Sequence, residues 1–476
     1  MTDLSSTPTT ETSRPPRERR RAMVSSWLGT TVEYYDFLLY GTAASLVFPE
    51  LFFPGAAPLL GVLASFASLA VGYFARPLGA VVFGHFGDRL GRRKMLVVTL
   101  VMMGAASFLM GLLPTYHQIG MAAPVLLVTL RILQGFAVGG EWAGAALMSM
   151  EHARPKGRGF AASVVASGGP SGAVLATLVL TPFSMLPSEQ FLSWGWRVPF
   201  ILSALLVVIG LVLRLVVTES PEFRAAAQRR ATSSAPASNA PAPIVAVLRH
   251  NPRGLVAGAL GTVAPLFMQS ILATFVLTYA VTVGGHERSD ALWLITIANA
   301  VHIVTIPAFA ALSDKVGRRP VMIAGAAAGI VLIWPMFALV ANGSWGALLL
   351  AFLIGNPLVQ AIMYGPLGAW IGEKFAADVR YTGVAVTYQL GSTLGAGLAP
   401  LAATGLLALG GGTNPIFVIA LFAGLCVISG AAYLLSRESH DDELALVTGP
   451  EGRSDGEAAP AAAAAAQRAE VSIGRS

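Results

Sequence analysis

The sequence predicts an all-helical membrane protein whose twelve spanning helices fall into two sets of six. The first observation is composition: of 476 residues, 55% are hydrophobic and 12% are charged, about half the charged share of roughly 25% found in soluble domains. The second is a series of apolar stretches of about 20 residues, the length that crosses a bilayer. The third is an alternation of basic and non-basic links. A soluble protein could not bury so much apolar surface, so lipid is the expected solvent.

The apolar stretches are separated by short polar links, except for the long link 218–253, which is rich in Ala, Ser, Pro and Arg. This link is expected to be cytoplasmic and to divide the spans six and six, with one bundle over 23–217 and another over 254–437. The polar ends, 1–22 and 438–476, are expected to be disordered and cytoplasmic. The predicted spans lie at about 25–48, 58–82, 94–113, 122–144, 158–182, 196–217, 255–283, 290–312, 320–340, 345–371, 381–408 and 415–436.

Basic residues gather on one side of the membrane in this arrangement. Clusters around Arg19, Arg92, Arg229 and Arg318 fall in links on the same side, whereas the opposite links hold only Arg288. Lys and Arg are enriched in cytoplasmic loops. A multi-pass protein of the cytoplasmic (inner) membrane is therefore predicted, with both termini in the cytoplasm.

The composition also argues against several classes of function. The net charge of +6 is accounted for by basic loops, so no nucleic-acid partner is expected. A single cysteine, Cys426, excludes a disulfide framework and a Cys-based metal site. The sequence holds neither a Gly-x-x-x-x-Gly-Lys-Ser/Thr loop nor a His-Glu-x-x-His motif. We therefore expect no cofactor, no catalytic or metal site and no enzyme activity.

One motif occurs twice, at the same place in each six-span half. The link after span two reads Gly-His-Phe-Gly-Asp-Arg-Leu-Gly-Arg-Arg over 84–93, and the link after span eight reads Ala-Leu-Ser-Asp-Lys-Val-Gly-Arg-Arg-Pro over 311–320. This is an internal repeat, and transporters are commonly built from such halves. The first copy resembles the signature of the major facilitator superfamily, and the second is a degraded copy. The resemblance implies two pseudo-symmetric six-helix bundles around a central cavity that opens to one side at a time.

The motif has a physical interpretation as a gate. Gly84 would let two helices approach closely, and Asp88 would accept hydrogen bonds from the start of a facing helix, where the helix dipole favours an anion. Glu141 in span four is expected to brace Arg92 or Arg93. The alternative is that the arginines only satisfy the charge rule for topology. The predicted gating residues are Gly84, Asp88, Arg89, Gly91, Arg92, Arg93, Glu141, Asp314, Arg318 and Arg319.

Segments outside the motif narrow the resemblance. They are Val-Glu-Tyr-Tyr-Asp-Phe from 32 in span one, Ala-Arg-Pro from 75 in span two, Arg-Ile-Leu-Gln-Gly from 131 in span four, Trp-Gly-Trp-Arg from 194 in span six, and Glu-Ser-Pro-Glu-Phe from 219 after it. Together they resemble the metabolite:proton symporters, a branch that imports small organic acids and compatible solutes.

Two carboxylates stand in the middle of span one, where a charge costs about 2.5–3.5 kcal/mol on insertion scales. Glu33 and Asp36 are three residues apart and share a helix face. A carboxylate that takes up and releases a proton is what a proton-coupled carrier requires, so both are predicted proton-coupling sites. The resemblance adds Arg131, whose counterpart in the superfamily motif is implicated in coupling. The alternative is that the acids form fixed hydrogen bonds or ion pairs within the bundle.

Arginine offers a planar fork that matches a carboxylate. By resemblance, Arg76 and Arg197 would together hold a substrate carboxylate. The alternatives are that Arg76 pairs with Asp36 or Glu33 and that Arg197 extends to the membrane surface. The remaining predicted substrate contacts are polar residues in spans one, four and eleven: Tyr40, Gln134, Tyr388 and Gln389.

The predicted function is proton-coupled import of a small organic acid or a zwitterionic solute by alternating access, carried out by a monomer in the lipid bilayer. A drug:proton antiporter of the same superfamily is an alternative, because Gly168–Gly172 partly matches the Gly-Pro motif of that group. A non-transporting membrane sensor is a third reading. It would require a folded signalling domain, which the Ala/Pro-rich tail does not offer.

Overall fold

The computed structural model describes residues 16–54, 58–154, 157–216 and 242–436, together with residues 218, 219, 223, 224 and 228. The chain divides into one unit, Met1–His440, and a terminal segment, Asp441–Ser476, which lies outside the described residues. All regular secondary structure in the described ranges is helical.

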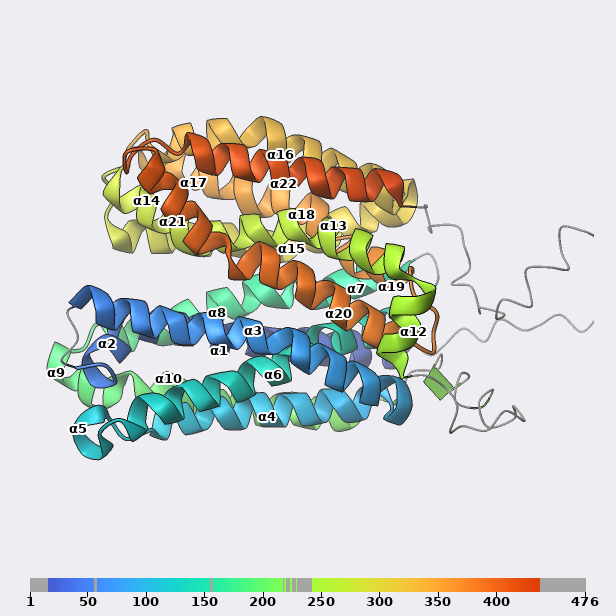
Figure 1. Cartoon of the computed structure of the whole chain (residues 1–476), viewed down its shortest axis with the longest axis horizontal. Helices are drawn as coiled ribbons and strands as arrows, with labels where there is room; N and C mark the ends of the chain where they lie inside the picture. Colours follow the sequence, from blue (N-terminus) through green and yellow to red (C-terminus); the bar gives the residue numbers. More distant parts are fainter. Residues whose placement is uncertain are drawn as a thin grey trace, which may run out of the picture. The chain divides into compact units, whose positions relative to one another are not determined.

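The first half of the chain forms one bundle, drawn in blue to green in Figure 1. Its long helices are α1 (Pro16–Leu46), α3 (Pro58–Leu90), α4 (Arg92–Leu112), α6 (Ala122–Glu151), the consecutive pair α7 (Arg158–Ala166) and α8 (Gly168–Ser184), and α10 (Arg197–Val216). Short segments join them at one end: α2 (Phe48–Leu51), α5 (Tyr116–Ile119), α9 (Ser188–Gln190) and the π-helical η2 (Phe191–Gly195).

The second half forms the other bundle, drawn in green to red in Figure 1. Three of its spans contain a π-helical segment. Its elements are α12 (Pro243–His250), α13 (Pro252–Ile271) with η4 (Leu272–Val276) and α14 (Leu277–Thr282), α15 (Arg288–Val316), α16 (Arg318–Val340), α17 (Trp345–Leu353) with η5 (Ile354–Gln360), α18 (Ala361–Tyr364) and α19 (Leu367–Gly372), α20 (Arg380–Ser392) with η6 (Thr393–Gly397) and α21 (Ala399–Leu409), and α22 (Ile416–Leu435).

Eleven helices in the described ranges are long and apolar enough to cross a membrane, from Ala67–Leu90 to Ile416–Leu435. Helix α1, the first predicted span, completes the twelve. It falls outside that group because its first turns are basic and Glu33 and Asp36 interrupt its apolar stretch. The observed elements match the twelve predicted spans in number and order, and the twelve-helix fold is confirmed.

The predicted boundaries need one correction at the start of the chain. Helix α1 begins at Pro16, with proline at a position that tolerates its missing N–H, so residues 16–22 are helical and not disordered as expected. Residues 1–15 and 437–476 lie outside the described residues, and the prediction of disorder there stays a prediction. Part of the central link is also ordered, because α12 occupies Pro243–His250.

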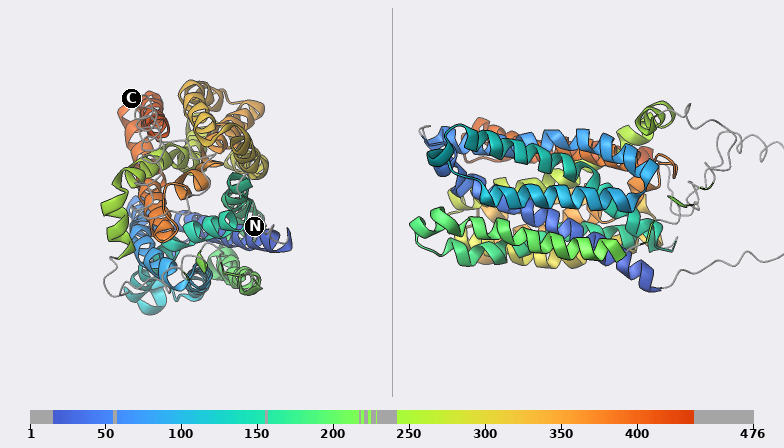
Figure 2. Two further views of the ribbon diagram at one scale, coloured as in Figure 1. Left: turned by 90° about the vertical axis from the view of Figure 1, so that its right-hand side faces the viewer. Right: turned by 90° about the horizontal axis from the view of Figure 1, so that it is seen from below.

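The repeated motif marks one end of the bundles, called here the motif end. There α3 turns directly into α4 through Gly91, and α15 turns into α16 through Gly317. Both glycines have a positive φ, 109° and 101°, a region that side chains disfavour. Helix α12 lies at this same end (Figures 1 and 2). The motif glycine is therefore the hinge of the same tight turn in both halves.

The two bundles pack side by side along their length (Figure 2). Helix α3 contacts α20, α6 contacts α20 and α19, and α15 contacts α7 and α8. Spans two and four of the first half thus face span eleven, and span eight of the second half faces span five. The contact of span two with span eleven thus corresponds to that of span eight with span five, as pseudo-symmetry between the halves requires.

Candidate functional site

A small cavity lies beside α1, α3 and α6 of the first bundle. Tyr73, whose ring packs on one cavity arginine, also abuts Gly397 of η6, so the cavity borders the second bundle. The residues that line it include both predicted charges of spans two and four: Glu33, Phe37, Gly72, Arg76, Arg131, Gln134, Gly135 and Val138.

A chain of hydrogen bonds leads from this cavity to Asp36. Arg131 Nη1 donates to Gln134 Oε1 at 2.5 Å, Gln134 Nε2 donates to Ser107 Oγ at 2.7 Å, and Ser107 Oγ donates to Asp36 Oδ2 at 2.6 Å. We call this the Asp36–Arg131 chain. All four residues are buried. The structure thus joins three predicted site residues and adds Ser107 of α4, which sequence reasoning missed because serine is common in membrane helices.

The two carboxylates of span one occupy different environments. Glu33 lines the cavity, and its Oε2 has no hydrogen-bond partner among the described residues. Asp36, one turn later, points to Ser107 of α4 and is 1% exposed. Neither forms an ion pair among the described residues, so the alternative in which Arg76 neutralises one of them is not what the structure shows. A buried carboxylate without a directly bonded cation is costly, which marks both as functional candidates.

Each arginine of the cavity lies between aromatic rings. The Arg76 guanidinium lies 4.2 Å from the centroid of the Tyr73 ring, and the Arg131 guanidinium lies 4.2 Å from that of Tyr40. Both are 5.4 Å from the ring of Phe37, which stands between them. Cation–π contacts hold these groups in place without consuming their N–H donors. The Nε atoms of both arginines are buried and unpartnered in the described structure, so donors remain for an anionic ligand.

Two other predicted substrate contacts, Tyr40 and Gln134, lie beside Arg131. The Tyr40 hydroxyl and Ser68 Oγ are 2.6 Å apart, and the ring covers the guanidinium of Arg131. Gln134 lines the cavity and bonds Arg131. Tyr40 is thus placed to hold Arg131, whereas Gln134 is placed to meet a ligand directly.

Arg197 does not join this site. Its Nη1 donates to the carbonyls of Gly111 and Leu113, at 2.9 and 2.7 Å, where α4 ends, and its guanidinium lies 4.5 Å from the Trp196 ring. Arg76 and Arg197 therefore do not line one cavity here, and the two-arginine clamp stays a prediction. Arg197 lies at the start of α10, remote from the motif end, and caps a neighbouring helix. Arg131 is the arginine that shares the cavity with Arg76.

Tyr388 and Gln389 lie between the bundles but do not line the cavity. The Tyr388 ring stacks on Trp142 of α6 with centroids 3.5 Å apart, and its hydroxyl is 3.0 Å from that of Tyr364. Gln389 Nε2 donates weakly to the Val138 carbonyl at 3.4 Å. In this arrangement both side chains contact the first bundle, and their role in substrate binding stays a prediction.

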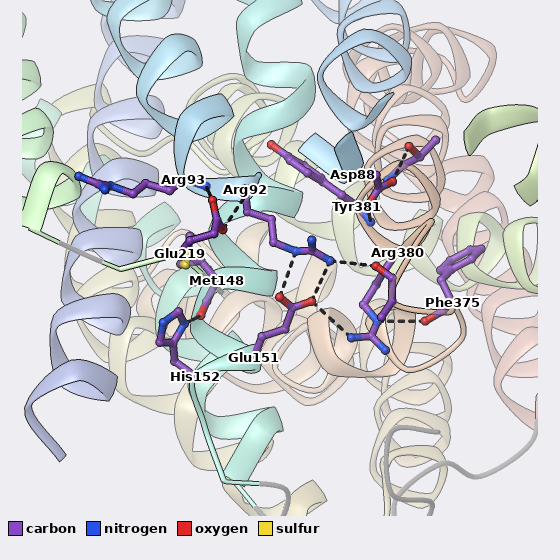
Figure 3. Close-up of polar contacts among 12 residues, drawn as sticks. Asp88, Arg92, Arg93, Met148, Glu151, His152, Glu219, Phe375, Arg380 and Tyr381 are labelled. Atoms are coloured by element: carbon purple, nitrogen blue, oxygen red, sulfur yellow. Dashed lines mark hydrogen bonds and ion pairs between the residues drawn. The ribbon is translucent and has the colours of Figure 1, made fainter. Parts of the chain in front are cut away.

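The first copy of the motif bonds directly to the second bundle. Asp88 accepts hydrogen bonds from the backbone N–H of Tyr381 at 3.1 Å, from that of Thr382 at 2.9 Å, and from the Thr382 hydroxyl at 2.8 Å. These groups open α20, so Asp88 caps its positive end (Figure 3). The predicted contact between Asp88 and the start of a facing helix is confirmed. Gly84 faces Thr382 closely, as a small residue there allows.

The second copy of the motif makes the equivalent contact to the first bundle. Asp314 accepts hydrogen bonds from the backbone N–H of Gly159 at 3.0 Å and of Phe160 at 2.8 Å, at the start of α7 in the first bundle. Asp314 also pairs with Arg318. Each half therefore caps a helix of the other at the motif end.

Buried ion pairs reinforce both contacts. Arg92 pairs with Glu151 at 3.0 Å, and the same carboxylate accepts from Arg380 of the second bundle at 3.3 Å (Figure 3). In the second half Arg318 pairs with Glu373 at 3.3 Å, at the end of α19. Glu151 and Glu373 were not singled out from the sequence. A buried arginine requires a carboxylate partner, so a search for acids near the same membrane side as Arg92 and Arg318 could have found them.

The second arginine of each motif copy binds a helix end. Arg93 donates to the carbonyls of Arg214 and Leu215 at the end of α10, and Arg319 donates to those of Tyr433 and Leu434 at the end of α22. Cations at helix C-termini are favoured by the dipole. Arg89, in contrast, is exposed.

Glu141 braces a different arginine from the one expected. It forms a buried ion pair with Arg214 of α10 and accepts a hydrogen bond from Thr99 at 2.7 Å. The expectation that it braces Arg92 or Arg93 is wrong, because Glu141 pairs with Arg214 and the carboxylate that reaches Arg92 is Glu151, further along α6. Glu219 takes part of that role: its carboxylate accepts from the backbone N–H of Arg92 and Arg93, at 3.2 Å each, and caps α4.

Two bundles of apolar spanning helices, with a charged cavity inside and helix caps exchanged at one end, define a membrane transporter. Residues 22–243 match the family described as "Sugar (and other) transporter", and residues 266–465 match the "Major Facilitator Superfamily". The "Shikimate transporter" of Escherichia coli (strain K12) is 41% identical over 422 residues, 88% of this chain and 95% of that protein. The chain belongs to the major facilitator superfamily.

Two further proteins place it more closely. The "Inner membrane metabolite transport protein YhjE" of the same bacterium is 38% identical over 90% of this chain and 97% of that protein. The solved structure of the proton:xylose symporter XylE bound to 6-bromo-6-deoxy-D-glucose covers 89% of this chain and 97% of its own, with a TM-score of 0.72 and 17% identity. The resemblance to metabolite carriers is thus confirmed, and the XylE likeness shows the shared fold.

Proposed function

We propose that this protein is a proton-coupled importer of a small organic acid across the inner membrane. The observation that carries the proposal is the Asp36–Arg131 chain, which connects a buried carboxylate to an arginine of the cavity. A substrate carboxylate would accept hydrogen bonds from the unpartnered Nε–H groups of Arg76 and Arg131, and the Phe37 ring would contact the rest of the substrate.

The chain supplies a route for coupling the proton to the substrate. Ser107 Oγ has one hydrogen, which it gives to Asp36, while it accepts from Gln134. A proton taken up at Asp36 Oδ2 would make this oxygen a donor to Ser107 Oγ, and the Ser107 hydroxyl would then reorient. That reorientation would change the hydrogen bond that Gln134 Nε2 donates to Ser107. Through the Gln134 amide it would also change the bond that Oε1 accepts from Arg131, and hence how Arg131 meets an anion. Proton and substrate would thus bias the same network.

The charge of the cavity supports an acid as the solute. Arg76, Arg131 and Glu33 line it together. With Glu33 protonated the lining carries two positive charges and attracts an anion. With Glu33 ionised the lining keeps a net positive charge but also offers a carboxylate to the cationic group of a zwitterion. The name of the shikimate transporter points to a carboxylic acid, so we take an organic acid as the solute. A zwitterion is the alternative solute if Glu33 is ionised when the solute binds.

Access to the cavity would alternate between the two ends of the bundles. The motif end is closed here by the exchanged caps of Asp88 and Asp314. The placement of Lys and Arg assigns this end to the cytoplasm, which puts both termini there, and the name of the inner-membrane relative suits that location. Opening would break the caps of both halves together. A monomer contains every residue invoked.

The test is uptake by the purified full-length protein in proteoliposomes. Labelled shikimate, an acid, and labelled proline, a zwitterion, are offered, each with and without an inward proton gradient. We expect accumulation of the acid that requires the gradient. Acid uptake that ignored the gradient would contradict symport. Gradient-driven efflux of either solute would make the protein an antiporter.

A further inference from the structure

Tyr381 of the second bundle has its side chain buried between helices of the first bundle. It is the second residue of α20 and is 0% exposed. Its N–H binds Asp88 of α3, and its hydroxyl donates to the carbonyl of Gly140 in α6 at 2.8 Å. Both partners belong to the opposite bundle, so these bonds exist only while the motif end is closed.

Glycines of the first bundle make the space that holds this ring. A methyl group on Gly87 of α3 would overlap the ring at Cδ1, and one on Gly144 of α6 would lie 2.6 Å from the hydroxyl oxygen. We call this space, bounded by Gly87, Gly140 and Gly144, the tyrosine socket. Its polar wall is the Gly140 carbonyl, which matches the single hydroxyl that enters.

The second copy of the motif has no such device. Asp314 caps Gly159 and Phe160 at the positions that correspond to Tyr381 and Thr382. Gly159 has no side chain to insert, and Phe160 is 43% exposed. Ser313 also stands where the first copy has Gly87, which would narrow a socket. The socket is therefore a property of one half, added to a cap that both halves share.

We propose that Tyr381 and the tyrosine socket form a latch that sets the closed state of the motif end. Opening must withdraw a buried aromatic ring and leave the Gly140 carbonyl without its partner, whereas closure restores both. The latch acts on the equilibrium between the two accessible states and not on the solute. It rests on the alternating-access part of the proposed function and needs neither the proton nor the identity of the substrate.

A cysteine reporter measures this equilibrium. Ala162 of α7 is buried against the second bundle, where a methyl group on Gly368 would lie 3.3 Å from its Cβ. The full chain carries Ala162→Cys, and the native Cys426, which is buried and free, is replaced by alanine. The alkylation rate by a polar maleimide then follows the fraction of molecules open at the motif end.

Tyr381→Phe removes only the hydroxyl and keeps the ring. We expect alkylation about 2- to 10-fold faster, as the loss of one buried hydrogen bond predicts. The matched control is Tyr433→Phe, because the Tyr433 hydroxyl also binds a backbone carbonyl, that of Gly261, but inside the second bundle. We expect no change there. An unchanged rate for Tyr381→Phe, or an equal rise in both variants, would overturn the latch.

Gly144→Ala tests the socket from the other side and should also raise the rate. Its control is Gly261→Ala, where the added methyl meets Trp370 at 2.6 Å within one bundle. Thermal unfolding and gel filtration identify variants that fail to fold, and Tyr381→Phe decides the question if the glycine variants do. Gradient-driven uptake by the parent protein, together with unaltered labelling of Tyr381→Phe, would refute the latch alone. Uptake by the parent protein that ignores the gradient, together with faster labelling of Tyr381→Phe, would refute symport alone.

Discussion

The two halves of this protein share a gate but not a cavity. At the motif end each half uses the same parts: a glycine of positive φ, an aspartate that caps a helix of the other half, and two arginines, one paired with a buried glutamate and one bound to a helix end. The charged cavity, in contrast, is lined by the first half alone. The symmetric parts of the protein thus form the gate, whereas the charged groups of the cavity come from one half.

The largest expected difference between the two gates lies in their ion pairs. Glu151 serves both Arg92 and Arg380, whereas in the second gate Arg318 has both Glu373 and Asp314. Glu151→Gln therefore leaves two buried arginines without this charge, and we expect about 3–5 kcal/mol of lost stability. Glu373→Gln should cost clearly less. Unfolding by denaturant in detergent measures both, and equal losses would show that the gates do not differ in this way.

The sequence predicted the gate better than the cavity, and the reason is physical. The Asp and Gly of the motif act through backbone geometry, which follows from local sequence, so the cap by Asp88 was foreseen from helix electrostatics. Arg197 could not be placed from the sequence, because an arginine near a helix end can bind a ligand or a neighbouring carbonyl, and only packing decides. Ser107 could not be predicted, since its role depends on the rotation of α4 against α1.

The motif glycines allow a comparison of intermediate size. Alanine at Gly91 (φ 109°, ψ 149°) or Gly317 (φ 101°, ψ 153°) must adopt a backbone conformation that is essentially restricted to glycine, at about 1–3 kcal/mol per residue. At Gly91 the new methyl would also overlap the carboxylate of Glu219, which caps α4. We expect Gly91→Ala to lower the midpoint of unfolding at least as much as Gly317→Ala. A smaller effect at Gly91 would argue that the capping carboxylate moves aside freely.

The two helix caps, by Asp88 and Asp314, should show the smallest effects. Asp88→Ala and Asp314→Ala each remove a helix cap, worth about 0.5–2 kcal/mol. We expect each to raise alkylation of the Ala162→Cys reporter, because both caps must break when the motif end opens. A rise with Asp88→Ala and none with Asp314→Ala would show that the second copy no longer contributes to closure.

The asymmetric cavity carries the central claim, that Asp36 links a proton to the solute through Ser107, Gln134 and Arg131. The most direct measurement compares Asp36→Asn with the parent protein in proteoliposomes, for uphill acid uptake driven by a proton gradient and for exchange of acid without one. Glu50→Gln, at an exposed carboxylate, is the control. The account predicts that Asp36→Asn loses uphill uptake and retains exchange. Uphill uptake at the parental level would contradict it.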